Sequence, residues 1–194
     1  NVWKDPATEH PSEPPLELEA VFRVLEALKR AEVFQVTFTG GEPLVRRDLV
    51  RIVSHAGSIG LRSNIVTNAT LMTRGLARDL RQAGLRNAQV SMHGPNPSVH
   101  DPLTLVPGSF DALLRGAVAL VTSGIHVNVN MTVSRANIDY IYQTARVARG
   151  LGARSFSITR FMYVGAGVLE QETLGITVQD QERILDELDA VEKE

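Results

Sequence analysis

Residues 34–49, FQVTFTGGEPLVRRDL, hold the pattern that decides the fold. The first six residues are mostly β-branched or aromatic, as in a strand, and two glycines end the run. Asp48 then precedes apolar residues at helical spacing that continue to Ile59, so we expect Asp48 to cap a helix. The stretch therefore predicts a strand, a glycine loop and a helix in succession.

The same strand and helix unit recurs along the chain. Further strands are predicted at residues 63–67, 88–92, 127–133 and 155–161. Further helices are predicted at residues 16–31, 73–83, 109–123, 138–151 and 177–194, the last with Thr177 as its cap. Four glycines stand between a helix and the next strand, where a left-handed backbone favours glycine: Gly60, Gly84, Gly124 and Gly152.

This alternation predicts an α/β fold with a parallel sheet and right-handed crossovers. The periodicity is compatible with a doubly wound sheet and with a barrel or partial barrel. In either architecture, ligands meet the loops that follow the C-terminal ends of the strands. These loops are residues 40–47, 67–73, 91–108, 132–137 and 161–167.

The composition is typical of a soluble globular protein. The 194 residues carry 20 Lys and Arg against 22 Asp and Glu, so the formal charge is -2 and no basic field favours nucleic acid. No apolar run reaches the roughly 20 residues that span a bilayer, and we expect a cytoplasmic protein. The sequence has no cysteine, which excludes disulfides, thiolate metal sites and cysteine nucleophiles within these residues.

The glycine loop offers a carboxylate at a strand end. Two glycines allow a ligand to approach the backbone closely, and Glu42 could accept hydrogen bonds from a cationic amine. The alternative is a tight turn with a solvated Glu42. We interpret the neighbouring Arg46 and Arg47 as a solvated helix entry, and Asn68 as a residue that serves either a turn or a ligand.

Several segments together resemble the core of radical S-adenosylmethionine (SAM) enzymes, in the branch with molybdenum-cofactor, pyrroloquinoline-quinone, haem-related and peptide-maturing members. They occur in the family's order: TFTGGEPLVRRDL, VTNAT, VSMHGPNPSVHD with VPGSFDALLRG, VNVNMTVSRAN and ITRFMYVGAG. The resemblance implies a partial (β/α)6, TIM-like barrel. It also implies that a [4Fe-4S] cluster reduces SAM to methionine and a 5′-deoxyadenosyl radical, which abstracts hydrogen from a substrate.

The resemblance further implies which residues bind SAM. Gly40 and Gly41 would receive the methionyl amino group through backbone carbonyls, and Glu42 through its carboxylate. Ser91 would contact the carboxylate or ribose of SAM. The remaining two matches are Asn130, an inward-facing polar residue, and Met162, whose backbone would lie along the adenine. Ser91 and Asn130 could instead bridge strand ends, and Met162 could fill the core.

The chain also departs from the family's pattern. Relatives often carry an arginine after the His-Asp pair that pairs with the SAM carboxylate, whereas residues 100–104 here read HDPLT. Arg135 and Arg160 are candidates to replace it. His93 and His100 lack a third partner at ligand spacing, so we expect them to serve turns or caps rather than a metal ion.

The missing cysteines then predict an incomplete barrel. The family's CxxxCxxC cluster motif lies after the first barrel strand, so we expect that strand and the cluster cysteines upstream of Asn1. Residues 1–15, with four prolines, would be the linker after the cluster loop, residues 16–176 the barrel, and residues 177–194 a helix leading out of the core. Many members of the resembled family continue into a cysteine-rich, SPASM-type C-terminal extension with auxiliary iron–sulfur clusters, and the resemblance extends this expectation to the present chain.

Two functional classes are compatible with these features. The first is a radical SAM enzyme that modifies a ribosomally made precursor peptide or a biosynthetic intermediate, with flavodoxin or ferredoxin as electron donor. The second is a non-catalytic, cysteine-free scaffold that keeps the barrel to bind a peptide or nucleotide. Cluster reconstitution and 5′-deoxyadenosine formation distinguish them.

Overall fold

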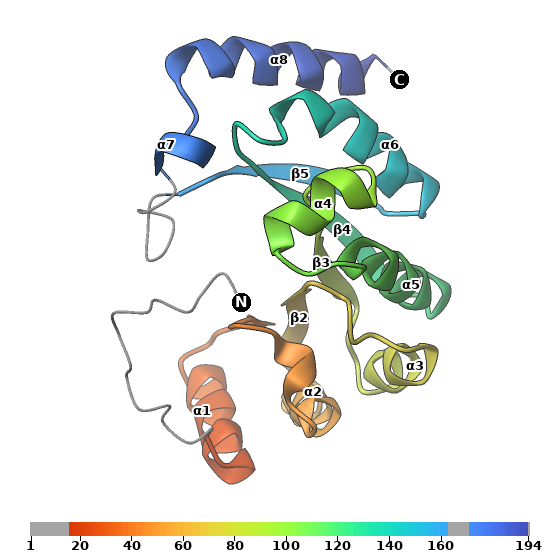
Figure 1. The fold of residues 1–194 in the computed structure, drawn as a ribbon. Coiled ribbons are helices and arrows are strands. Elements are labelled where there is room, and N and C mark those ends of the chain that lie inside the picture. The colour runs from red at the N-terminus through yellow and green to blue at the C-terminus, as the bar shows by residue number, and fades with distance from the viewer. Residues whose placement is uncertain (1–15, 163–170, 194) are drawn as a thin grey trace.

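The structure is a computed structural model that describes residues 16–162 and 171–193 (Figure 1). The predicted linker 1–15 and most of the last predicted loop lie outside these residues. The strands are β1 Gln35–Phe38, β2 Arg62–Thr67, β3 Asn87–Ser91, β4 His126–Val133 and β5 Ser155–Arg160. The helices are α1 Leu18–Arg30, η1 Pro43–Val45, α2 Leu49–Ser58, α3 Arg74–Gln82, α4 Pro97–Thr104, α5 Ser109–Thr122, η2 Ile138–Tyr140, α6 Ile141–Gly150, α7 Gln171–Leu174 and α8 Val178–Glu192.

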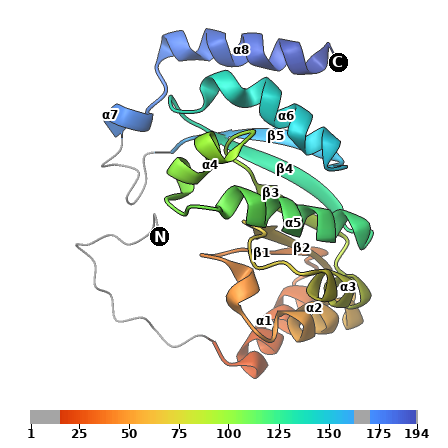
Figure 2. The ribbon, with the colours of Figure 1, turned by 45° about the vertical axis from the view of Figure 1, so that its right-hand side comes forward.

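The five strands form one parallel sheet in the order β1-β2-β3-β4-β5. This confirms the predicted strands and the parallel topology. A doubly wound sheet reverses its strand order at a switch point, whereas this order never reverses. The sheet curves as part of a barrel, with α2, α3, α5 and α6 outside it (Figures 1 and 2). The partial barrel is therefore the correct alternative.

The alternation of apolar and polar residues along the strands explains why the helices cover one face of the sheet. Ile65, Val90 and Val129 are fully buried and belong to the main hydrophobic cluster, which the helices complete. The intervening positions, such as Asn64, Gln89 and Asn128, point to the opposite, concave face. The sheet thus has an apolar outer face under helices and a polar inner face.

Local signals place most helix boundaries. The Thr73 hydroxyl accepts from the backbone N–H of Leu76, and Thr177 forms a capping box with Asp180. The four predicted glycines before strands all have positive φ, between 77° and 109°.

Within the described residues, no single helix is long and apolar enough to cross a membrane, and α4 with α5 meets that test only as a pair bent by 101°.

Three local expectations are wrong. The predicted long loop 91–108 contains α4, which Asn96 caps by accepting from the backbone N–H of Val99. Asp48 stands at the N-cap of α2 but makes no side-chain cap; its carboxylate pairs with Arg46, with Nε to Oδ1 at 2.7 Å. Arg46 is half-buried rather than solvated. Its guanidinium pairs with the Asp48 carboxylate, which would otherwise be available to cap the helix.

The last helix packs back on the barrel. In both views α8 runs beside α6 (Figures 1 and 2). Ile184 and Leu188 of α8 pack against a cluster that includes Met131 and Ile141. The carboxylate of Glu187 also accepts a hydrogen bond from the Tyr142 backbone N–H, in the first turn of α6. Helix α8 therefore covers the outer side of β4 and α6.

Candidate functional site

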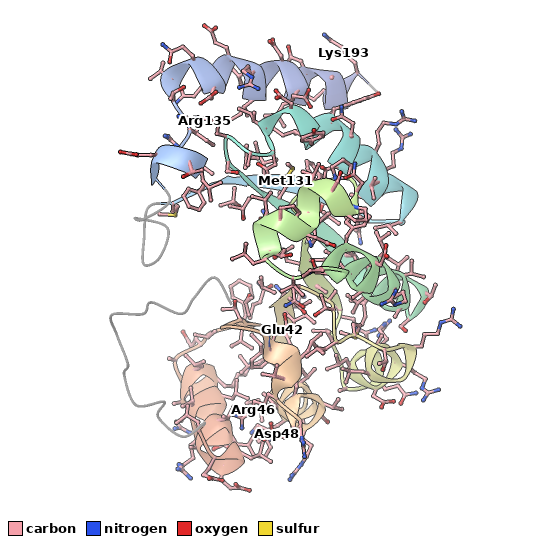
Figure 3. The ribbon with its side chains drawn as sticks, viewed as in Figure 1. Glu42, Arg46, Asp48, Met131, Arg135 and Lys193 are labelled. Atoms are coloured by element: carbon pink, nitrogen blue, oxygen red, sulfur yellow. The ribbon has the colours of Figure 1, made fainter. Side chains whose placement is uncertain are left out.

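The carboxylate of Glu42 is oriented by donors from two strand ends. Its Oε1 accepts from the Thr67 hydroxyl at 2.6 Å and from the Leu44 backbone N–H at 3.1 Å. Its Oε2 accepts from the Asn68 backbone N–H at 2.8 Å. Glu42 directly precedes η1, on the same side of the molecule as Arg46 and Asp48 (Figure 3). Glu42 is thus fixed rather than freely solvated, and Oε2 keeps room for a second donor.

The two preceding glycines leave the backbone accessible. A Cβ added to Gly40 or Gly41 would meet no atom within 4 Å, and both residues are exposed. Gly40 also has φ +141°, a conformation that side chains rarely adopt. An open backbone beside an oriented carboxylate fits an ammonium-bearing ligand, because carbonyl and carboxylate oxygens are acceptors only. The residues present therefore fit the methionyl amino group of SAM.

Ser91 and Asn130 lie next to each other on the concave side. They are register partners across β3 and β4. The Asn130 side chain, 9% exposed, donates to Ser157 at 3.0 Å and to Thr159 at 2.9 Å on β5. Asn130 is thus held against β5. Met162 follows β5 and is 65% exposed, so it does not fill the core.

These residues occupy one end of the sheet. Gly40, Gly41 and Glu42 follow β1, Ser91 ends β3, and Met162 follows β5. Neighbouring strands lie about 4.8 Å apart, so the glycine loop and Ser91 are separated by roughly 10 Å along the sheet. The structure therefore places these expected SAM residues along one edge of the sheet.

His93 and His100 organise the loop after β3. The His100 Nδ1 accepts from the His93 backbone N–H at 3.0 Å, and the His93 Nδ1 accepts from the Thr132 backbone N–H at 3.3 Å. The rings stack at 5.6 Å. Burial and the nearby His100 lower the pKa of His93 to about 4, and burial lowers the pKa of His100. Both rings are neutral acceptors at physiological pH, as the predicted turn role requires.

Two further residues complete this loop. The Asn137 amide donates to the carbonyls of His93 and Thr132, at 3.0 and 2.9 Å, and so joins the ends of β3 and β4. The Asp101 carboxylate accepts from the backbone N–H groups of Phe110 and Gly108, which hold its pKa below the usual range. Asp101 thereby binds the start of α5, although it lies in a different helix.

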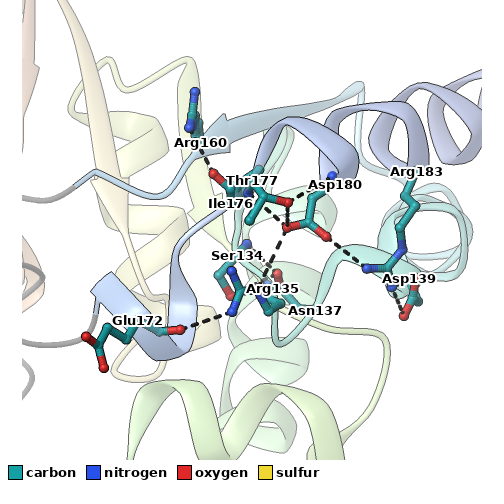
Figure 4. Close-up of polar contacts among 10 residues, drawn as sticks. All are labelled: Ser134, Arg135, Asn137, Asp139, Arg160, Glu172, Ile176, Thr177, Asp180 and Arg183. Atoms are coloured by element: carbon teal, nitrogen blue, oxygen red, sulfur yellow. Dashed lines mark hydrogen bonds and ion pairs between the residues drawn. The ribbon is translucent and has the colours of Figure 1, made fainter.

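Arg135 and Arg160 are engaged away from the glycine loop (Figure 4). The Arg135 guanidinium donates to the Glu172 carbonyl at 3.1 Å, and Arg160 donates to the Ile176 carbonyl at the same distance. Arg135 Nε also lies 3.8 Å from the Asp180 carboxylate. Both side chains hold the segment that leads into α8. The geometry gives no support to the expectation that they pair with the SAM carboxylate.

Asn68 serves a turn, which is one of its two expected roles, and its backbone orients Glu42. Its side-chain Oδ1 accepts from the Thr70 backbone N–H at 2.9 Å, a local turn, while its own N–H contacts Glu42. Sequence reasoning missed Thr67, whose contact joins residues 25 positions apart, and Asn137, whose contact with His93 spans 44. One feature of the sequence could have indicated these contacts: Thr67 and Asn137 both lie at or just after the C-terminal end of a predicted strand.

No iron ligand set is present in the part of the chain that the structure describes. That part contains no group of three or more His, Cys, Asp or Glu side chains placed to hold a metal ion. The 194 residues also contain no cysteine. These residues therefore do not fit a [4Fe-4S] cluster, whereas the glycine loop and Glu42 fit the amino group of SAM.

The sequence and the fold match known proteins. The profile of the Radical SAM superfamily matches residues 2–148. The AdoMet-dependent heme synthase of Oleidesulfovibrio alaskensis is 35% identical over 153 residues, which are 77% of this chain and 38% of that protein. The PqqA peptide cyclase of Methylocella silvestris is 30% identical over 176 residues, 91% of this chain and 47% of that one. The chain thus spans less than half of these relatives.

Solved structures agree on the fold. Streptococcus suis SuiB bound to precursor peptide SuiA matches with a TM-score of 0.73 and 17% identity, covering 87% of this chain and 37% of SuiB. Native anSMEcpe with bound AdoMet matches with a TM-score of 0.72 and 13% identity, covering 90% of this chain and 51% of that one. Sequence profile, relatives and fold agree, and the chain belongs to the radical SAM superfamily of enzymes.

Proposed function

We propose that this chain is the SAM-binding core of a cytoplasmic radical SAM enzyme that modifies a peptide or an intermediate of cofactor biosynthesis. One observation carries the proposal: the oriented Glu42 carboxylate stands beside an open glycine backbone at the end of β1. A carboxylate pairs with an ammonium more strongly than a neutral acceptor does. This loop therefore suits the methionyl end of SAM.

The other expected residues would contact the remaining parts of SAM. The Ser91 hydroxyl can donate to the SAM carboxylate or to a ribose oxygen. Asn130, held by Ser157 and Thr159, presents a rigid polar surface next to Ser91. The backbone at Met162 would lie along the adenine. These residues would orient SAM across the upper edge of the barrel.

The proposal needs iron ligands from outside the 194 residues, because the sequence has no cysteine. A [4Fe-4S] cluster held by such ligands, and reduced by a donor such as flavodoxin or ferredoxin, would supply the electron that cleaves SAM to methionine and a 5′-deoxyadenosyl radical. The concave face of the sheet would hold the substrate from which hydrogen is taken. Two kinds of relative support the substrate class: the PqqA peptide cyclases and the SuiB complex with its precursor peptide favour a peptide. The heme synthases favour a cofactor intermediate.

Anaerobic reconstitution of the full-length protein tests this function. With iron, sulfide, SAM and a strong reductant, we expect iron–sulfur absorbance and formation of 5′-deoxyadenosine. Iron in excess of one cluster per chain would indicate auxiliary clusters. A folded protein that forms neither cluster nor 5′-deoxyadenosine would contradict the proposal and identify a non-catalytic scaffold.

A further inference from the structure

A second polar site lies on the concave face, at the opposite end of the strands. It is a cavity of about 210 Å³ to which all five strands contribute. Its polar floor includes Asn64 on β2, Asn87 and Gln89 on β3, and Asn128 on β4. The expected SAM residues lie at the C-terminal ends of the strands, whereas this cavity lies toward their N-terminal ends.

The strand register orders the inward-facing side chains in rows. Ser91 pairs with Asn130 in the upper row, Gln89 with Asn128 in the next, and Asn87 with Asn64 below it. Successive rows are two residues apart, which is about 7 Å along a strand. Gln89 therefore lies about 7 Å below the level of Ser91, and Asn87 about 13 Å below it.

Three of the four amides in the cavity have side-chain partners. Asn87 donates to the Asn64 side chain at 3.2 Å, and the Ser155 hydroxyl donates to the Asn128 side chain at 3.1 Å. Gln89 is different. It is half-buried on the central strand, yet among the described residues its amide has no hydrogen-bond partner. A half-buried amide on a cavity floor offers one acceptor and two donors to whatever enters.

The charges around the cavity select the kind of ligand. No lining residue carries a carboxylate or a lysine amine. The only full cation of the lining, Arg154, contacts the His126 ring with its Nη1 2.9 Å from Nδ1. An ammonium would gain no counter-ion here, and an anion would meet a single cation, Arg154, which already contacts the His126 ring. An uncharged amide loses less hydration than an ion and can pair with a Gln or Asn side chain through a donor and an acceptor at once.

We propose that this cavity anchors an uncharged segment of a peptide substrate, and that Gln89 binds a main-chain amide of that segment. This inference rests on the proposed function, because it names the substrate of the same barrel. The cavity is smaller than the roughly 300–1,000 Å³ of complete ligand pockets, so it holds one part of a larger molecule. An extended peptide rises about 3.3–3.6 Å per residue. The reacting residue would accordingly lie two to four residues from the anchored one.

Binding of a capped tetra-alanine peptide, with an acetyl and an amide end, tests the proposal on the full-length protein. Ligand-observed NMR titration measures the peptide affinity of the wild type and of Gln89→Leu. We expect the variant to bind about tenfold more weakly, because one hydrogen-bonding amide is lost. Gln143→Leu is the matched control, since Gln143 is exposed on α6, outside the barrel.

Gln89→Glu provides a second variant of nearly unchanged size. It keeps acceptors but removes both donors, so it should also bind the peptide weakly. If Gln89→Leu does not fold, the affinity of Gln89→Glu tests the proposal instead. Either of two results would overturn the proposal: wild-type protein that does not bind the peptide, or folded Gln89 variants that bind it as the wild type does.

Failure of this inference can be separated from failure of the proposed function. Normal 5′-deoxyadenosine formation, with peptide affinity indifferent to Gln89, contradicts the peptide anchor alone. Gln89-dependent peptide binding without any 5′-deoxyadenosine formation contradicts the radical chemistry alone.

Discussion

Glu42 has its orientation set by residues of the neighbouring strand. Thr67 and Asn68, at the end of β2, each donate one hydrogen bond to its carboxylate. Without them, the local contact with the Leu44 N–H would be its one remaining hydrogen bond among the described residues. The preorganised carboxylate loses little side-chain freedom when an ammonium binds, and this increases the contribution of that contact to affinity.

Replacement of Glu42 by glutamine tests this role. Glu42→Gln keeps the size of the side chain and removes its charge. A hydrogen bond to a charged group contributes about 1.5–3 kcal/mol, so SAM affinity should fall roughly 10- to 100-fold. Isothermal titration of the reconstituted full-length protein measures it, with Glu19→Gln on the exposed face of α1 as control. Equal SAM affinity in Glu42→Gln and wild type would remove Glu42 from the site.

His93 makes stability depend on pH. Its pKa is about 4 in the folded protein and about 6.5 in an unfolded chain, so the unfolded state binds more protons between these values. The stabilisation is fully present above pH 6.5 and is lost as the pH falls toward 4. Between pH 7 and pH 5 the loss from His93 is about 2 kcal/mol.

Urea unfolding at both pH values, for the wild type and His93→Asn, isolates this contribution from the carboxylates. Asparagine can still accept from the Thr132 N–H but does not titrate. The variant should therefore lose about 2 kcal/mol less than the wild type on acidification. An identical pH dependence in the two proteins would show that His93 is not buried as described.

At the level of elements, α5 and the loop after β2 approach each other unusually closely. A Cβ at Gly116 would lie 2.0 Å from the backbone oxygen of Ala69. Ala69 is itself fully buried and has φ +59°, so neither side can move easily. The same loop carries Asn68, whose N–H binds Glu42. Packing of a helix on the outside of the barrel thus positions a residue of the site.

Gly116→Ala should therefore affect both stability and ligand binding. We expect a loss of roughly 1–3 kcal/mol in unfolding free energy from overpacking, together with weaker SAM binding. Gly150→Ala is the control, because Gly150 ends α6 with open space around its Cα and should change stability by at most about 1 kcal/mol in the favourable direction. Urea unfolding compares the two. Equal stability of Gly116→Ala and wild type would contradict the close approach.

For the whole molecule, α8 covers the part of the core that lies beside β4 and α6. Met131, Val133, Ile138 and Ile141 lie under it, and Ile184 and Leu188 complete the cluster. Arg135 and Arg160 hold the segment that leads into α8. The helix therefore contributes to the stability of the barrel.

Two leucines of α8 allow a test of whether this helix packs on the core. Leu188 is partly buried in the cluster, whereas Leu185 is 61% exposed. Leu188→Asp should lower the unfolding free energy by roughly 1–3 kcal/mol, because it places a carboxylate against apolar side chains. Leu185→Asp should stay within about 0.5 kcal/mol of the wild type. Similar urea midpoints for both variants would mean that α8 does not pack as described.

The sequence by itself determined the strands, most helices and the glycine loop. These features are local: a strand or helix repeats its apolar face every two or every three to four residues, and a left-handed turn needs glycine at one position. Helix α4 escaped prediction, although Asn96 and Pro97 are typical of a helix start, because Pro102 interrupts its short pattern.

Only the tertiary structure decided which side chains meet. Thr67 reaches Glu42, and Asn137 reaches His93, because parallel strands bring their C-terminal ends to one edge of the sheet. The pairing of Arg46 with Asp48, and the lack of a partner for Gln89 among the described residues, likewise depend on which groups lie within reach. Spacing along a chain carries no information about such contacts, since they arise when separate elements pack around a common core.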